Sequence, residues 1–127
     1  MFLLCAGLGC AGVAAPERSF QAPPGEVRAA TLAALAAHED VREEGDVLRA
    51  GWGPERESGS QGFLLGQGYR YRTRYTVLLS GPTASVSAVV ERRAPGGVRS
   101  RNWERVDGEA AAEALLAEIG RRLEKNP

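Results

Sequence analysis

The stretch Tyr69–Ser80, YRYRTRYTVLLS, decides the fold of this chain. Its odd-numbered positions hold tyrosine, threonine, valine and leucine, and its first even-numbered positions hold arginine. Side chains of a β-strand point alternately to the two faces of a sheet, and aromatic and β-branched residues favour such a half-buried setting. The stretch therefore predicts a strand with one face on a core and with Arg70, Arg72 and Arg74 on the other.

A hairpin partner follows this strand. Gly81-Pro82 is a typical turn dipeptide, and residues 84–92 (ASVSAVVER) alternate again between the two faces. Residues 94–97 (APGG) predict a second turn, and residues 98–106 predict a short further strand. The strands are therefore expected to form an antiparallel meander.

Another strand is predicted upstream. Residues 41–52 alternate weakly, with Leu48, Ala50 and Trp52 on one face, and the sequence EEGD at 43–46 is typical of a turn or bulge. Residues 53–68 contain five glycines, one proline and two serines, which indicates a long loop.

Two helices flank the strands. Residues 26–38 (EVRAATLAALAAH) contain no glycine or proline, and Pro24 is suited to the first turn. Residues 107–124 form an amphipathic pattern with Asp107 as a good N-cap. Each helix has one apolar face, and one face of the sheet is charged. The predicted fold is α+β: a three- to four-stranded antiparallel meander with the N- and C-terminal helices packed on one face.

Composition restricts the function. The 127 residues suffice for one domain, and 16 basic residues balance 16 acidic ones, so no overall field favours nucleic acid as a partner. Both cysteines lie in the first ten residues, and His38 is the only histidine. A metal site, a cofactor and catalytic residues are therefore not predicted, and His38 is assigned to the end of its helix, where it interacts with the dipole.

The first sixteen residues, MFLLCAGLGCAGVAAP, carry no charge. A bilayer span needs about 20 residues, so this apolar run is typical of the hydrophobic region of a signal peptide. We expect a leader at 1–16, a linker at 17–25, a single α+β domain at 26–127, and export of the protein to the bacterial cell envelope.

Two processing sites compete within the leader. The sequence Gly7-Leu8-Gly9-Cys10 resembles a lipobox, in which the cysteine becomes lipidated, and it predicts an anchor at Cys10 on the outer membrane, facing the periplasm. The small residues of Gly12-Val13-Ala14 predict instead a cut that releases a soluble product. Stable anchoring requires more than one acyl chain, and such lipoproteins carry several.

Candidate contact residues lie outside the predicted core. Arg70, Arg72 and Arg74 form either an anion-binding stripe or a solvated face that discourages edge aggregation. Residues Phe63, Leu64 and Leu65 interrupt a glycine- and serine-rich loop, and either tuck onto the core or dock on a partner or membrane. Trp52 and Trp103 are assigned to core or rim packing, with an exposed anchor as the alternative. Five acidic residues in 39–46 match no calcium-loop spacing and indicate a solvated connection.

The order of these features resembles a known family. A lipobox-like leader is followed by FQAPPGEV at 20–27, an alanine-rich helix, an acidic turn, a strand ending in Gly51-Trp52, the strand YRTRYTV at 71–77, and a final amphipathic helix. This pattern is similar to one helix-grip unit of the BamC lipoproteins of the outer-membrane β-barrel assembly machinery. Those proteins have two such units, and this chain has room for one. The resemblance implies a non-enzymatic envelope lipoprotein and assigns no binding residue.

Two functional hypotheses follow. The first is an envelope lipoprotein that serves as an accessory or scaffold in outer-membrane assembly, with an envelope protein as partner and a lipid anchor in the membrane. The second is a soluble secreted module that binds an anionic ligand through Arg70, Arg72 and Arg74. An enzyme would require a site built from Asp, Glu, Arg and Tyr alone.

Overall fold

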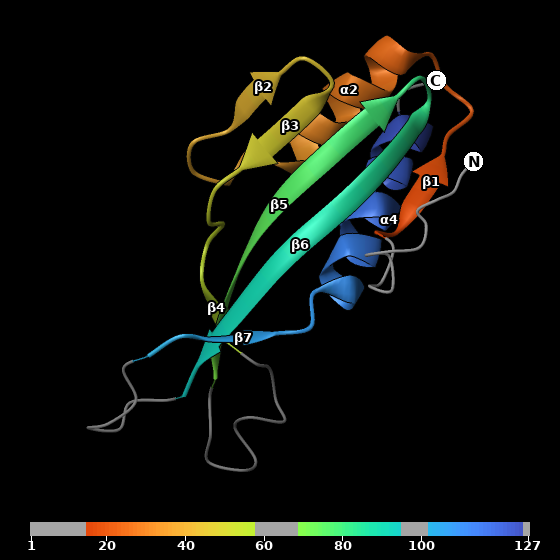
Figure 1. Cartoon of the computed structure of the whole chain (residues 1–127). Helices are drawn as coiled ribbons and strands as arrows, with labels where there is room; N and C mark the ends of the chain where they lie inside the picture. Colours follow the sequence, from red (N-terminus) through yellow and green to blue (C-terminus); the bar gives the residue numbers. More distant parts are fainter. Residues whose placement is uncertain (1–14, 58–68, 95–101, 126–127) are drawn as a thin grey trace, which may run out of the picture.

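The fold was obtained as a computed structural model, which describes residues 15–57, 69–94 and 102–125 (Figure 1). It belongs to the α+β class, as predicted, and contains an antiparallel sheet and the helices α2 (Pro24–Ala34) and α4 (Glu109–Lys125). Within the described residues, neither helix has the length and apolar character needed to cross a membrane.

The sheet contains more strands than the sequence predicts. Its central strands run in the order β1-β6-β5-β3-β2, while β4 also pairs with β5 and β7 with β6. The strands of the described residues are β1 (Glu17–Ser19), β2 (Arg42–Glu44), β3 (Val47–Ala50), β4 (Arg56–Glu57), β5 (Arg70–Ser80), β6 (Thr83–Arg93) and β7 (Glu104–Val106). The added strands β1, β2 and β4 have two or three residues each, too few for alternation to mark them.

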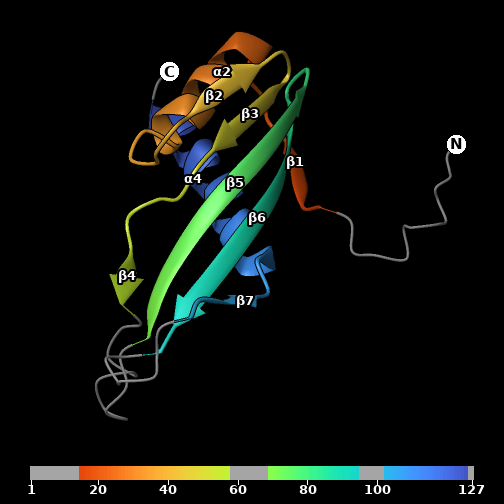
Figure 2. The same ribbon diagram turned by 60° about the vertical axis from the view of Figure 1, so that its left-hand side comes forward.

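The hairpin of β5 and β6 is the centre of the sheet, and its prediction is confirmed. The two strands pair along their whole length, from Ser80 with Thr83 to Arg70 with Arg93. Gly81 lies in the turn with φ of +58°, a conformation that glycine adopts without steric cost. In Figures 1 and 2 this long hairpin runs beyond the helices at one end.

Both helices pack on the same face of the sheet, as predicted (Figure 2). In the core, Val27 of α2 and Ile119 of α4 meet sheet residues such as Leu48, Val77 and Val86, all of which are fully buried. The odd-numbered residues of β5 supply Val77 and Leu79 to this core, so the alternation of YRYRTRYTVLLS is confirmed. The opposite face, which we call the outer face, carries Arg70, Arg72 and Arg74 of β5.

Helix α2 ends four residues before the predicted end at His38. The backbone N–H of His38 bonds to Leu35 O at 2.9 Å, which closes a tight turn after Ala34. Leu35 is fully buried in this turn, and His38 Nδ1 bonds to Gly51 O at 2.8 Å. Tertiary contacts therefore end a helix that its propensity would have extended.

Two further predicted boundaries differ from the structure, namely the start of the C-terminal helix and the linker at 17–25. Helix α4 begins after Gly108, whose carbonyl accepts a hydrogen bond from Ala112 N at 3.0 Å, so the prediction of Asp107 as the cap is wrong by one residue. A Cβ atom at Gly108 would clash with the backbone carbonyl oxygen of Ala88, which explains why glycine stands there. The segment 17–25, predicted as a linker, contributes β1 to the sheet and the start of α2.

Candidate binding face of the sheet

The outer face is left open by the elements that the structure describes. Helices α2 and α4 both lie on the other side of the sheet (Figures 1 and 2). Leu78 on β5 is 50% exposed, whereas its neighbours Val77 and Leu79 are buried. The outer face is therefore the broad sheet surface that remains available to a partner.

A stack of arginine and tryptophan side chains crosses this face. The guanidinium of Arg72 lies between two indole rings, 4.0 Å from the centroid of Trp52 and 4.2 Å from that of Trp103. Arg74 continues the stack at 4.7 Å from Trp52, and Arg93 continues it at 4.7 Å from Trp103. Each contact falls within the range of a cation–π interaction. We call these five residues the arginine–tryptophan stack.

Arg72 is the fixed centre of the stack. Its Nε and one terminal nitrogen donate to Glu91 Oε1 at 3.0 and 2.6 Å. The side chains are only 24% and 17% exposed, so the pair is shielded from solvent more than the surface pairs of the protein. Because its charge is already matched by Glu91, Arg72 stabilises the sheet rather than offering a free cation to a ligand.

The position of Trp52 contradicts its prediction. The alternation of 41–52 placed it on the core face with Leu48 and Ala50, but it lies on the outer face against Arg72 and Arg74. The seven residues from Ala50 to Arg56 oppose only the five from Tyr75 to Tyr71 on β5, so the pairing contains a bulge. Such an irregularity redirects side chains, and here it turns Trp52 to the other face.

Neither tryptophan belongs to the core or is fully exposed. Both are half-buried, and both contact arginines rather than the helices. The sequence does not show that both tryptophans stack on Arg72, because this arrangement depends on the bulge after Ala50 and on the return of the chain at β7.

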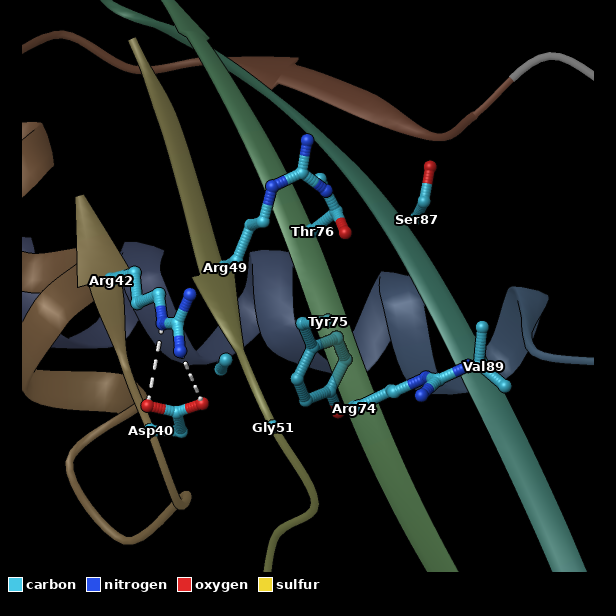
Figure 3. A pocket seen from close by; sticks show the side chains of 10 residues that line it. Asp40, Arg42, Arg49, Gly51, Arg74, Tyr75, Thr76, Ser87 and Val89 are labelled. Carbon is cyan, nitrogen blue, oxygen red and sulfur yellow. Dashed lines mark hydrogen bonds and ion pairs between the residues drawn. The ribbon is translucent and has the colours of Figure 1, made fainter. Parts of the chain in front are cut away.

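Beside the stack, the outer face contains an open hollow of about 440 Å³ (Figure 3). Arg42, Arg49 and Arg74 project from three different strands around it, and Thr76 and Ser87 contribute hydroxyl groups. In Figure 3 the side chain of Arg74 extends across the hollow towards Val89 on β6. The hollow thus combines guanidinium groups with a partly apolar floor.

The three arginines differ in their partners. Arg42 pairs with Asp40 at 3.2 Å, and Arg49 pairs with Glu44 at 3.0 Å. All four of these side chains are at least half exposed, so each pair is worth only about 0–1 kcal/mol and can exchange for another anion. Within the described part of the chain, Arg74 has no carboxylate partner, so its charge is the one most open to a ligand.

The structure describes the three predicted arginines but not the three predicted apolar contact residues. Arg70, Arg72 and Arg74 share the outer face, as expected, but Arg70 pairs with Glu55 at 3.0 Å and Arg72 with Glu91. Of the stripe, Arg74 alone lacks an ion pair with the described residues. Residues Phe63, Leu64 and Leu65 lie outside the described residues. Arg42 and Arg49 were missed, because only the β2–β3 hairpin brings them beside Arg74.

Four of the five acidic residues of 39–46, namely Asp40, Glu43, Glu44 and Asp46, pair with nearby arginines. Arg28 of α2 bonds to Glu43 at 3.1 Å and approaches Asp46 at 3.5 Å, so the cluster ties α2 to the β2–β3 hairpin. Among residues 15–57, 69–94 and 102–125, no group of three or more possible metal ligands comes together. The only histidine also has a structural contact, since its ring packs on Tyr75 with centroids 5.3 Å apart.

Tyr75 gives a pH-dependent test of the packing on the helix side. Burial raises the pKa of its phenol above the ordinary value of 10.0, against a smaller opposing effect of Arg56. Its contribution to stability is therefore fully present below about pH 10 and is lost as the pH rises through the higher folded-state pKa. We expect the urea midpoint to fall more between pH 9 and pH 11 in the natural protein than in Tyr75→Phe. An equal fall in both would contradict this packing.

The chain was compared with protein families, with curated proteins and with solved structures. None of the three comparisons finds a match.

Proposed function

We propose that this protein is a non-enzymatic binding module of the bacterial cell envelope, tethered through a lipid on Cys10. In this proposal its outer face receives an acidic segment of a partner protein, as expected of an accessory or scaffold in envelope assembly. The observation that carries the proposal is that Arg74 forms no ion pair with the described residues and lies in a hollow beside Arg42 and Arg49, on the sheet face opposite both helices.

An acidic peptide suits this hollow chemically. The planar guanidinium groups can donate two parallel hydrogen bonds to a carboxylate, and Arg42 and Arg49 hold only exposed pairs that a ligand can displace. Val89 of β6 lines the hollow and Leu78 of β5 is exposed on the same face, so a peptide with short apolar groups between its carboxylates finds contacts as well as charges. The arginine–tryptophan stack provides a rigid neighbour that holds Arg74 in place.

The arrangement of elements agrees with the rest of the proposal. One helix before and one helix after an antiparallel sheet, both on the same face, support a single helix-grip unit similar to those of BamC lipoproteins. The sole histidine is bonded to Gly51 and packed on Tyr75, which supports a structural role for it. These features favour a binding protein over an enzyme.

Peptide binding can be measured by the fluorescence of Trp52, because Arg74 stacks on its ring. A short peptide of alternating glutamate and serine is expected to change the tryptophan emission saturably, and more weakly at high salt. One charge-assisted contact is worth about 1.5–3 kcal/mol, so Arg74→Gln should weaken binding by about 10- to 100-fold.

Arg18→Gln is the matched control. Arg18 also has no ion pair with the described residues, but it pairs opposite the core residue Ala84 and so lies on the helix side of the sheet. Its replacement should leave peptide binding unchanged. Equal losses in both variants, or a stronger response to anionic lipid vesicles than to the peptide, would overturn the proposal.

The anchor is tested separately. Palmitate labelling of the protein in cells is expected and should disappear in Cys10→Ser, because this cysteine follows Gly9 in the lipobox-like sequence. Labelling that persists in Cys10→Ser, or the absence of labelling in the natural protein, would contradict anchoring at Cys10.

A further inference from the structure

A second hollow, of about 250 Å³, lies on the helix side of the sheet and is separate from the outer-face hollow. Tyr75 and Thr73 of β5 form one wall, and Ala111 and Ala114 of α4 form the other. The larger core residues of α4, such as Leu115 and Ile119, fill the space against the sheet elsewhere. Because alanine side chains are short, the first turns of α4 leave room above the tyrosine ring.

The polar groups around this space are few and have defined roles. His38 Nδ1 lies 2.8 Å from Gly51 O, and a carbonyl only accepts, so Nδ1 carries a proton and donates it to this carbonyl. The hydroxyl of Tyr75 donates to Ala111 O at 3.4 Å, a distance longer than a good hydrogen bond, so a closer acceptor would attract it. Burial raises the pKa of Tyr75, which keeps this hydroxyl a donor at neutral pH.

Arg56 of β4 supplies the charge at the opening. It lines the hollow and is exposed, and no carboxylate of the described residues pairs with it. Other arginines, such as Arg28, Arg72 and Arg122, form ion pairs with acidic side chains. An unmatched guanidinium beside an aromatic and apolar cavity is the arrangement expected for an amphiphilic anion.

We infer that this hollow binds a small monocarboxylate with an aromatic or short aliphatic body. The carboxylate is held by Arg56, and the body lies between the Tyr75 ring and the two alanines of α4. The volume of about 250 Å³ lies just below the range of about 300–1,000 Å³ that is usual for ligand pockets, so a single ring or a short chain fits and a diacyl lipid does not. This site does not depend on the function proposed for the outer face.

Benzoate serves as the test ligand for this hollow, and benzamide, which has the same ring but no charge, serves as the control. Titrating benzoate into the isotope-labelled protein should give saturable shifts of the Gly53, Thr73 and Ala111 amides, with a Kd on the order of 0.1–1 mM for so small a ligand. Benzamide should bind at least about tenfold more weakly, since it lacks the charge-assisted contact with Arg56.

Three variants separate the possible results. Arg56→Gln should weaken benzoate binding about tenfold or more. Ala114→Leu should abolish binding by filling the hollow, and because Ala114 is exposed at its rim, the fold should tolerate the change. Arg74→Gln, on the outer face, should leave benzoate binding unchanged.

Several outcomes would overturn the inference. These are the absence of saturable shifts at these amides, equal affinity for benzoate and benzamide, full binding by Ala114→Leu, and loss of binding in Arg74→Gln. The thermal unfolding of each variant shows whether it is folded. A failure here leaves the peptide response of Trp52 untouched, so the two sites are tested independently.

Discussion

Replacing Arg72 with alanine is expected to lower the free energy of unfolding by about 2–3 kcal/mol. The change removes a guanidinium held between Trp52 and Trp103 and leaves Glu91, only 17% exposed, without its partner. Each cation–π contact adds about 0.5–1 kcal/mol at such sites. Urea unfolding measures the loss, and the tryptophan emission should shift as the rings are uncovered.

Two further variants show which property of Arg72 matters. Arg72→Lys keeps the charge but loses the planar fork and most of the stacking, so its cost should fall between those of the natural protein and Arg72→Ala. Arg74→Ala removes an exposed end of the stack and should cost less than about 1 kcal/mol. Equal costs for Arg72→Ala and Arg74→Ala would show that the stack has no fixed centre.

The second large effect concerns two adjacent leucines on β5. Leu79 is 7% exposed and packs in the core, whereas Leu78 is 50% exposed on the outer face. Leu79→Ala should therefore cost about 3 kcal/mol through lost burial and a cavity, and Leu78→Ala should cost less than about 1 kcal/mol. Both variants make the same chemical change one residue apart, so each controls for the other.

This pair tests which face of the sheet the helices cover. If Leu78→Ala were the more damaging, another element would have to cover the outer face, and the hollow between Arg42, Arg49 and Arg74 would not be available. If both costs were small, β5 would not be the central strand of the core.

The sequence predicts the centre of the fold well, because its signals there are local. Eleven residues of β5 alternate strictly, Gly81-Pro82 marks the turn, and the partner strand alternates in the same way. The apolar stripe of α4 and the alanine-rich α2 likewise follow from helical periodicity. These elements suffice for the class and for the side on which the helices pack.

Features that depend on distant contacts were not predictable. The end of α2 is set by the burial of Leu35 and by the bond from His38 to Gly51, both of which involve the packed fold. Trp52 changes face because of a bulge between Ala50 and Arg56; Gly51 and Gly53 indicate an irregular strand there, but they do not show which face Trp52 takes. The strand β1 pairs with a segment more than sixty residues away, so its three residues carry no signal of their own.

The candidate site was only partly visible in the sequence for the same reason. Alternation places Arg70, Arg72 and Arg74 on one face, but it does not distinguish an arginine with an ion pair from one without. Those partners come from elsewhere in the chain: Glu55, just before β4, pairs with Arg70, and Glu91 of β6 pairs with Arg72. Only the folded sheet shows that Arg74 remains open and that Arg42 and Arg49 stand beside it.

The arginine–tryptophan stack links stability to the proposed function. Glu91 fixes Arg72 by hydrogen bonds, and Arg72 stacks on the indole ring of Trp52. Trp52 in turn contacts Arg74 at the edge of the hollow. A ligand that binds Arg74 therefore meets a side chain with restricted freedom, which lowers the entropy lost on binding.

A charge exchange at Arg74 tests the central proposal most directly. The natural protein should bind a peptide of alternating glutamate and serine and bind the matching lysine–serine peptide much more weakly. Arg74→Glu should lose the acidic peptide, and its preference should move towards the basic one, because the exchanged charge lies within the hollow. Titration of the tryptophan emission with both peptides measures this. An unchanged preference in Arg74→Glu, with the variant fully folded, would contradict the assignment of the outer face as the binding surface.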